Sequence, residues 1–186
     1  MSRAQHLAGP FAALLTLLPI CVAAQPVQTP SAEAIVALVT ASPQLRIDST
    51  IFSSGFDAKT HPYVNVRNAP EGTIGGYLVP EGANAGTQRD GTYVLAVPLD
   101  SGGSGGIFTQ IIFAGRSAQM LAYAGFVDSG GHLSVSISDG AIVAQLPYYG
   151  DDSPNCCPKK YVVRTYTVRS GSLVKLSERF EAAKDE

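Results

Sequence analysis

The sequence lacks tryptophan and is poor in charge, since Asp, Glu, Lys and Arg make up only 15% of its 186 residues. The 13 cationic residues are scattered among 15 anionic ones, and no basic stripe stands out. Proteins that bind nucleic acid neutralise its phosphates with clustered basic side chains, so no nucleic-acid partner is expected. Glycine and small hydroxyl residues are plentiful instead, which is typical of a β-rich protein exported to an oxidising compartment.

Long apolar runs are also scarce, and the one of note lies at the N-terminus. Arg3 precedes the apolar run Leu7–Val22, which is followed by two small alanines. This layout predicts a secretory signal peptide over residues 1–24. Pro19 interrupts the run, which is short against the ~20 apolar residues of a spanning helix, so no membrane span is expected after cleavage. The predicted localisation is periplasmic or secreted.

Cysteine occurs three times, and the signal peptide contains Cys21. If the chain were a lipoprotein, Cys21 would be acylated, but Ile20 stands where that signal requires a small residue. After cleavage no third cysteine is left for an ordinary intramolecular disulfide with Cys156 or Cys157, and the C-x-x-C spacing of redox dithiols is absent. A vicinal disulfide between these neighbours, a bond to another chain and free thiols remain open, and the vicinal bond is favoured.

A vicinal disulfide would act locally. Neighbouring Cα atoms lie about 3.8 Å apart across a trans peptide, below the usual ~4.4 Å for bridged cysteines, so the bond is strained. Pro154 and Pro158 fix φ on either side and favour a stiff turn. Exposed tyrosines beside such a turn are good rigid contact residues, and the equally open alternative is that both tyrosines pack under the turn. The candidate binding residues in and beside this turn are Tyr148, Tyr149, Asp151, Asp152 and Asn155.

The remaining chain has the size of one ordinary domain. Residues 25–30 read as an extended leader and residues 31–186 as a single β-rich domain. We expect an α+β fold with a mostly antiparallel meander sheet and one N-terminal helix packed on it. Ser31 is the expected N-cap of that helix, which ends near Ala41. A short last helix is expected over Glu178–Lys184. The expected strands are Leu45–Phe52, Pro62–Val66, Ile74–Val79, Thr92–Pro98, Ile107–Ala114, Met120–Val127, His132–Ser138, Ala141–Tyr148, Tyr161–Arg169 and Ser172–Leu176.

Two hairpins follow from turn chemistry. Asp139-Gly140 is a two-residue loop that accepts positive φ at both positions, which predicts a type I′ turn. The resulting register places the apolar residues of both strands on one face, as hydrophobic alternation also requires. Ser170-Gly171 is expected to close a second hairpin. The predicted pairs of the first are Ser138–Ala141, Ile137–Ile142, Val135–Ala144 and Leu133–Leu146.

Motifs for chemistry are few. Gly102–Gly106 fits G-x-S-x-G around Ser104, but a nucleophile elbow needs a helix after the serine, and a strand is expected there. The histidines that remain after cleavage, His61 and His132, show no metal-ligand spacing to each other or to the cysteines. We therefore predict no catalytic residue, no metal site and no cofactor. The alternative is an envelope enzyme, redox or hydrolytic, that uses Cys156–Cys157 or Ser104.

The C-terminal half resembles a known family. Its order of elements, with Asn155-Cys156-Cys157-Pro158 before a strand rich in Tyr and Arg and a final hairpin, is similar to the LppP/LprE-like secreted bacterial proteins. The likeness covers about Thr92–Leu176, and the Asp- and Asn-rich segment of that family is reduced here to Asp90. The resemblance implies an exported or envelope-associated protein of unassigned role. We expect a non-enzymatic binding or structural module, with another envelope protein as its partner.

Overall fold

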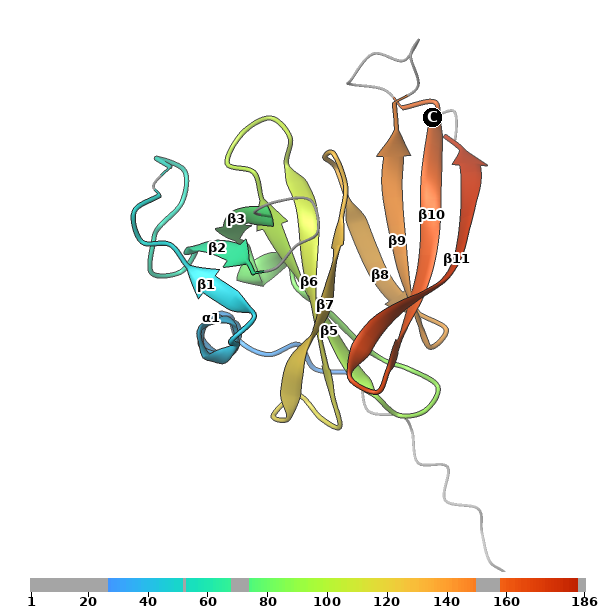
Figure 1. The fold of residues 1–186 in the computed structure, drawn as a ribbon, viewed down its shortest axis with the longest axis horizontal. Coiled ribbons are helices and arrows are strands. Elements are labelled where there is room, and N and C mark those ends of the chain that lie inside the picture. The colour runs from blue at the N-terminus through green and yellow to red at the C-terminus, as the bar shows by residue number, and fades with distance from the viewer. Residues whose placement is uncertain (1–26, 52, 68–73, 150–157, 184–186) are drawn as a thin grey trace, which may run out of the picture.

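The computed structural model describes residues 27–51, 53–67, 74–149 and 158–183. Within these residues the chain forms antiparallel β-sheets and one α-helix, so the expected β-rich antiparallel fold is confirmed. The strands are divided between two sheets, where a single sheet was expected. Figure 1 shows three layers, with the helix on one side, the larger sheet in the middle and the smaller sheet on the other side.

Helix α1 spans Ala32–Ala41, close to the predicted bounds. Ser31 caps it as predicted, because its hydroxyl accepts a hydrogen bond from the backbone N–H of Ala34 at 3.3 Å. Ile35 and Val39 lie one turn apart and are buried, and they share a core with the larger sheet. The helix therefore covers one face of that sheet with a narrow apolar stripe.

Sheet A, the larger sheet, has the order β1-β2-β3-β5-β6-β7, and β4 also pairs with β5. Its strands are β1 (Leu45–Ile47), β2 (Tyr63–Val66), β3 (Ile74–Leu78), β4 (Asn84–Thr87), β5 (Tyr93–Asp100), β6 (Ile107–Gly115) and β7 (Leu121–Asp128). The two strands β3 and β4 share one edge of β5, because β4 pairs with the first half of β5 and β3 with its end. A short 3₁₀ helix, η1 (Pro80–Gly82), connects them.

Sheet B is a four-stranded meander in the order β11-β10-β9-β8. Its strands are β8 (Ser134–Ser138), β9 (Ala141–Tyr148), β10 (Lys160–Arg169) and β11 (Ser172–Ala182). Both predicted hairpins are present. Asp139 and Gly140 have φ values of 49° and 75°, and Ser170 and Gly171 have values of 50° and 77°. Positive φ at both central residues is the requirement of a type I′ turn, so the turn chemistry identified both connections correctly.

The register of the first hairpin also matches the prediction from Ser138–Ala141 to Val135–Ala144. The expected Leu133–Leu146 pair lies beyond the ladder, which begins at Ser134. Leu133 is nevertheless buried in the core between the sheets.

Strand β5 lies at the centre of the fold, and both of its faces are covered. Val94 and Ala96 face sheet B and join a core with residues of β6, β7, β9 and β10. Leu95 and Val97 face the opposite way and join Ile35 of α1 in a second core. A strand covered on both faces reads as a continuous apolar run instead of an alternating one.

The two sheets also meet at both lateral edges. On one side β4 packs on β8, where Asn84 Nδ2 donates to the carbonyl of Val135 at 3.2 Å. On the other side β7 packs on β11, where Leu173 lies against Gly125. A Cβ on Gly125 would lie 2.9 Å from Cβ of Leu173, so glycine permits the close approach of these strands.

Three expectations about the elements were wrong. Residues Glu178–Lys184 do not begin a helix, because β11 continues as a strand to Ala182. Strand β4, Asn84–Thr87, was not expected, since its small and polar residues carry no apolar alternation. The first strand ends at Ile47, well before Phe52, because the next residue starts a turn. Asp48 Oδ1 accepts from both the N–H and the hydroxyl of Thr50.

Candidate functional site

An exposed aromatic pair marks the end of sheet B where β9 finishes and β10 begins. Tyr148 is 46% exposed and Phe180 is 61% exposed, although both are large apolar side chains. Their ring centroids are 5.4 Å apart and the rings are nearly perpendicular, at 84°. Edge-to-face contact is a favoured arrangement of two aromatic rings. We call Tyr148, Phe180 and the neighbouring Lys160 the aromatic patch.

The strand register shows which side of sheet B the aromatic patch occupies. Val162 in β10 stands directly across from Leu146 on one neighbouring strand and from Phe180 on the other. Residues directly opposite one another share a face of the sheet. Leu146 and Val162 are buried between the sheets, so Phe180 belongs to the same inner face. Its exposure means that sheet A does not cover this part of that face.

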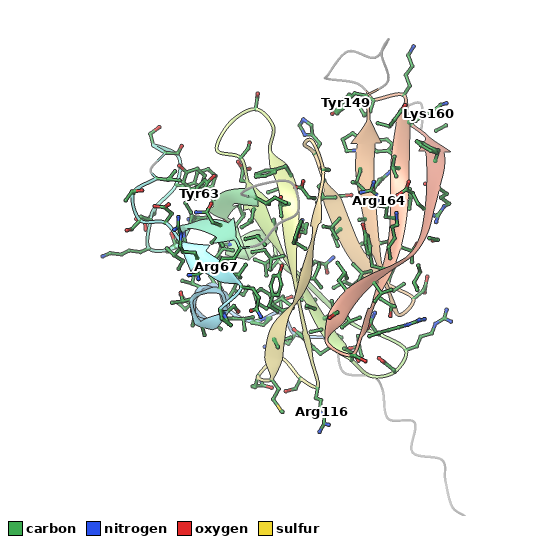
Figure 2. The ribbon with its side chains drawn as sticks, in the orientation of Figure 1. Tyr63, Arg67, Arg116, Tyr149, Lys160 and Arg164 are labelled. Carbon is green, nitrogen blue, oxygen red and sulfur yellow. The ribbon has the colours of Figure 1, made fainter. Side chains whose placement is uncertain are left out.

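Lys160 adds a positive charge to the patch. It stands across from Tyr148 in the ladder between β9 and β10 and is exposed. Figure 2 places Lys160 and Tyr149 together at the upper end of the molecule, and Arg116, in the turn between β6 and β7, at the opposite end.

Further along the same inner face, the charges are paired with one another. Arg164 Nε donates to Glu178 Oε2 at 2.8 Å, and Lys175 Nζ reaches the same oxygen at 3.1 Å. These hydrogen bonds, with that from Arg164 the stronger influence, hold the pKa of Glu178 below its usual range. The carboxylate is thus shared between two cations inside this network.

The sequence predicted Tyr148 and Tyr149 as binding residues. Tyr148 is exposed within the aromatic patch, and Tyr149 beside it is half-buried. The other predicted residues, Asp151, Asp152, Asn155, Cys156 and Cys157, lie outside the described part of the chain, as does the predicted signal peptide.

Phe180 was missed because Glu178–Lys184 was read as a helix. The predicted hairpin at Ser170-Gly171 could have identified Phe180 as a strand residue. A two-residue turn at Ser170-Gly171 pairs each residue of β10 with one residue after the turn. Strand β10 runs for ten residues, so its partner must extend to about Ala182 and carry Phe180 as a strand residue.

The glycine loop Gly102–Gly106 has no nucleophile-elbow geometry. Strand β6 begins at Ile107, directly after the loop, where the elbow would need a helix. The structure does bring His132 to this loop, since its Nδ1 would lie 3.7 Å from a Cβ on Gly106. Between Ser104 and His132 the described part of the chain shows no hydrogen bond.

His61 is held by its neighbours in a different part of the molecule. Its Nε2 lies 2.9 Å from Glu81 Oε1, and its Nδ1 lies 2.9 Å from Thr60 Oγ1. Among the described residues, no three His, Cys, Asp or Glu side chains gather as a set of metal ligands would. The same residues include no helix with the length and apolar character needed to cross a membrane.

The fold and the patch together define an antiparallel β-sandwich with one covering helix and an exposed aromatic end. Comparison with known proteins adds no relative, because no family model, no curated protein and no solved structure matches this chain.

Proposed function

We propose that this protein is a non-enzymatic, exported recognition module that binds a partner protein through the aromatic patch. The observation that carries the proposal is the pair Tyr148 and Phe180, two large apolar rings left 46% and 61% exposed at one end of the inner face of sheet B. Aromatic side chains in that position supply most of the binding energy of many protein interfaces.

The form of the patch supports binding over mere surface exposure. The two rings are anchored on β9 and β11, the strands on either side of β10, so their spacing is set by the ladder. Because the rings already contact each other, a partner that covers them meets a reduced cost in side-chain entropy. Lys160 between them favours a partner surface that combines apolar groups with acidic ones.

The sequence adds a further element to the proposal. Asp151, Asp152 and Asn155 follow Tyr149 within a few residues, and we include them among the proposed contact residues. The predicted signal peptide and the resemblance of the Asn155-Cys156-Cys157-Pro158 element to exported LppP/LprE-like proteins favour an exported protein, so the proposed partner is an envelope or secreted protein.

Site-specific photo-crosslinking tests the proposal. A benzophenone amino acid is placed at Phe180 in the full chain, expressed in its native host, and compared with the same residue at Met120. Met120 is a matched control because it is 62% exposed but lies in the turn between β6 and β7. We expect one adduct of discrete mass from position 180 and none from position 120. No adduct, or the same adduct from both positions, would refute a partner at the aromatic patch.

A muramidase inhibitor is one concrete form of this function, with Asp151-Asp152-Ser153 as the loop that enters the enzyme. Lytic activity is measured with and without micromolar protein. Unchanged activity would discard this form while leaving the crosslinking test to judge the broader proposal.

A further inference from the structure

A second surface feature lies at the opposite end of the sandwich from the aromatic patch. Three turns meet there, which connect β4 to β5, β6 to β7 and β10 to β11, and they line an open pocket of about 620 Å³. Pockets of roughly 300–1,000 Å³ accommodate small organic ligands. Figure 2 shows Arg116 of the second turn at this lower end, with Tyr149 at the upper end.

Small residues make up much of the pocket lining. Gly91, Gly115 and Gly171 line it, one from each turn. Ala114 and Val168 line it too, and both belong to the core between the sheets. The pocket is thus a depression at the end of the sandwich core with an apolar inner wall.

The long side chains that line the pocket are two arginines. Arg116 and Arg169 are both exposed, and within the described residues neither guanidinium makes an ion pair. Arg46, Arg164 and Arg179, by contrast, are each paired with a carboxylate. Two unpaired guanidinium groups against the single carboxylate of Asp90 leave the pocket lining with a net positive charge.

The one carboxylate in the pocket lining is already engaged. Asp90 Oδ1 accepts the backbone N–H of Thr92 at 2.9 Å, within its own turn. This bond, followed by one from the Thr92 hydroxyl, holds the pKa of Asp90 below its usual range. The lowered pKa keeps Asp90 ionised, and its hydrogen bonds hold it within its own turn, where the structure pairs it with neither arginine.

We propose that this pocket binds a small organic oxyanion, with Arg116 and Arg169 as the groups that recognise its phosphate or carboxylate. The planar fork of guanidinium donors matches both kinds of oxyanion. The volume exceeds what a lone ion would fill, and the apolar wall formed by Ala114 and Val168 would contact the ligand body. The aromatic patch plays no part in this site, so the two proposals stand or fall separately.

Three probes that share the same sugar ring test the proposal. They are glucose 6-phosphate, glucuronate and the uncharged glucose. Binding is followed in the full chain by the amide NMR signals of Gly91, Gly115 and Gly171, which mark the three turns. We expect one or both anionic sugars to shift these signals in a saturable manner, and glucose to leave them unchanged. Arg116→Gln and Arg169→Gln should each weaken that binding at least tenfold.

Arg67→Gln is the matched control, because Arg67 is exposed, loses the same charge and lies beyond β2 in sheet A, as Figure 2 shows. It should bind the anionic sugars like the unaltered protein. Equal weakening in all three variants would mean a general charge effect and overturn the proposal. Binding of glucose or of inorganic phosphate as tight as that of the anionic sugars would also overturn the proposal. The absence of a response to either anionic sugar would do the same.

Discussion

Gln88 and Thr167 join the two sheets through their side chains. Gln88 Nε2 donates to Thr167 Oγ1 at 2.9 Å, and Gln88 Oε1 accepts the backbone N–H of Val168 at 3.2 Å. The ladder between β9 and β10 ends at Tyr166, so Val168 lies beyond the reach of β9. The amide of Gln88 therefore replaces the missing strand neighbour at this edge of β10.

Replacing Gln88 by leucine should destabilise the protein. Gln88 is only 4% exposed, so its loss leaves a buried N–H on Val168 without an acceptor. An unsatisfied buried donor costs about 1–3 kcal/mol. The free energy of unfolding is measured in urea, with Gln119→Leu as the control because Gln119 is exposed in the turn between β6 and β7. A loss no greater than that of the control would contradict this role of Gln88.

Gly86 should not tolerate alanine, for a reason that lies in the neighbouring sheet. A Cβ on Gly86 would overlap Cγ2 of Ile137 and lie 2.8 Å from its Cβ. Ile137 is β-branched and stiff, so β4 and β8 would have to separate, at a cost of about 1–3 kcal/mol.

A double-mutant cycle tests this close approach. Ile137→Ala removes the overlapping methyl group, so Gly86→Ala should cost less in that background than in the unaltered protein. Gly55→Ala is the control, since no atom lies within 4 Å of its would-be Cβ. Strictly additive losses of unfolding free energy would show that Ile137 is not what restricts residue 86.

The elements that could be predicted from the sequence are those with a local signal. Asp139-Gly140 and Ser170-Gly171 reveal their turns by residue type, and Ser31 reveals its helix by capping chemistry. Strand β4 could not be predicted, because Asn84–Thr87 is held by pairing with β5 and by packing on β8 and not by any pattern of its own. The division into two sheets likewise depends on contacts between distant segments.

The candidate sites were predictable only in part. Tyr148 precedes the segment that contains the cysteine pair, and that position in the sequence was enough to single it out. Its partner ring, Phe180, comes from another strand and was concealed by the wrong helix. The arginine pocket had no signal at all, since Arg116 and Arg169 come from segments far apart in the chain that meet only when both sheets form.

Glu81 should have a lowered pKa that depends on His61. The hydrogen bond from His61 is the main cause, and it holds the pKa of the Glu81 carboxyl below its ordinary value. Folded Glu81 then binds a proton less readily than unfolded Glu81. Its contribution to stability is present above the ordinary glutamate pKa and is lost as the pH falls through the lowered value. Because Glu81 is largely exposed, this contribution is small.

Titration of the carboxyl carbons by NMR measures this pKa directly. In His61→Ala the pKa of Glu81 should rise toward its ordinary value. The pKa of Asp90, which is lowered by Thr92, should not change and serves as the internal control. An unchanged pKa for Glu81 in His61→Ala would show that the histidine is not the cause.

Cys156 and Cys157 are predicted to form a vicinal disulfide in the exported protein. Reduction of such a bond adds two hydrogens, so the intact monomer should gain about 2 Da when treated with reductant. It should not react with an alkylating agent beforehand, because no thiolate is present. The doubly substituted variant Cys156→Ser, Cys157→Ser should show no mass change and gives the control. Rapid alkylation without reductant would reject the disulfide and favour the alternative of an enzyme with reactive cysteines, and a reducible dimer would indicate bonds between chains.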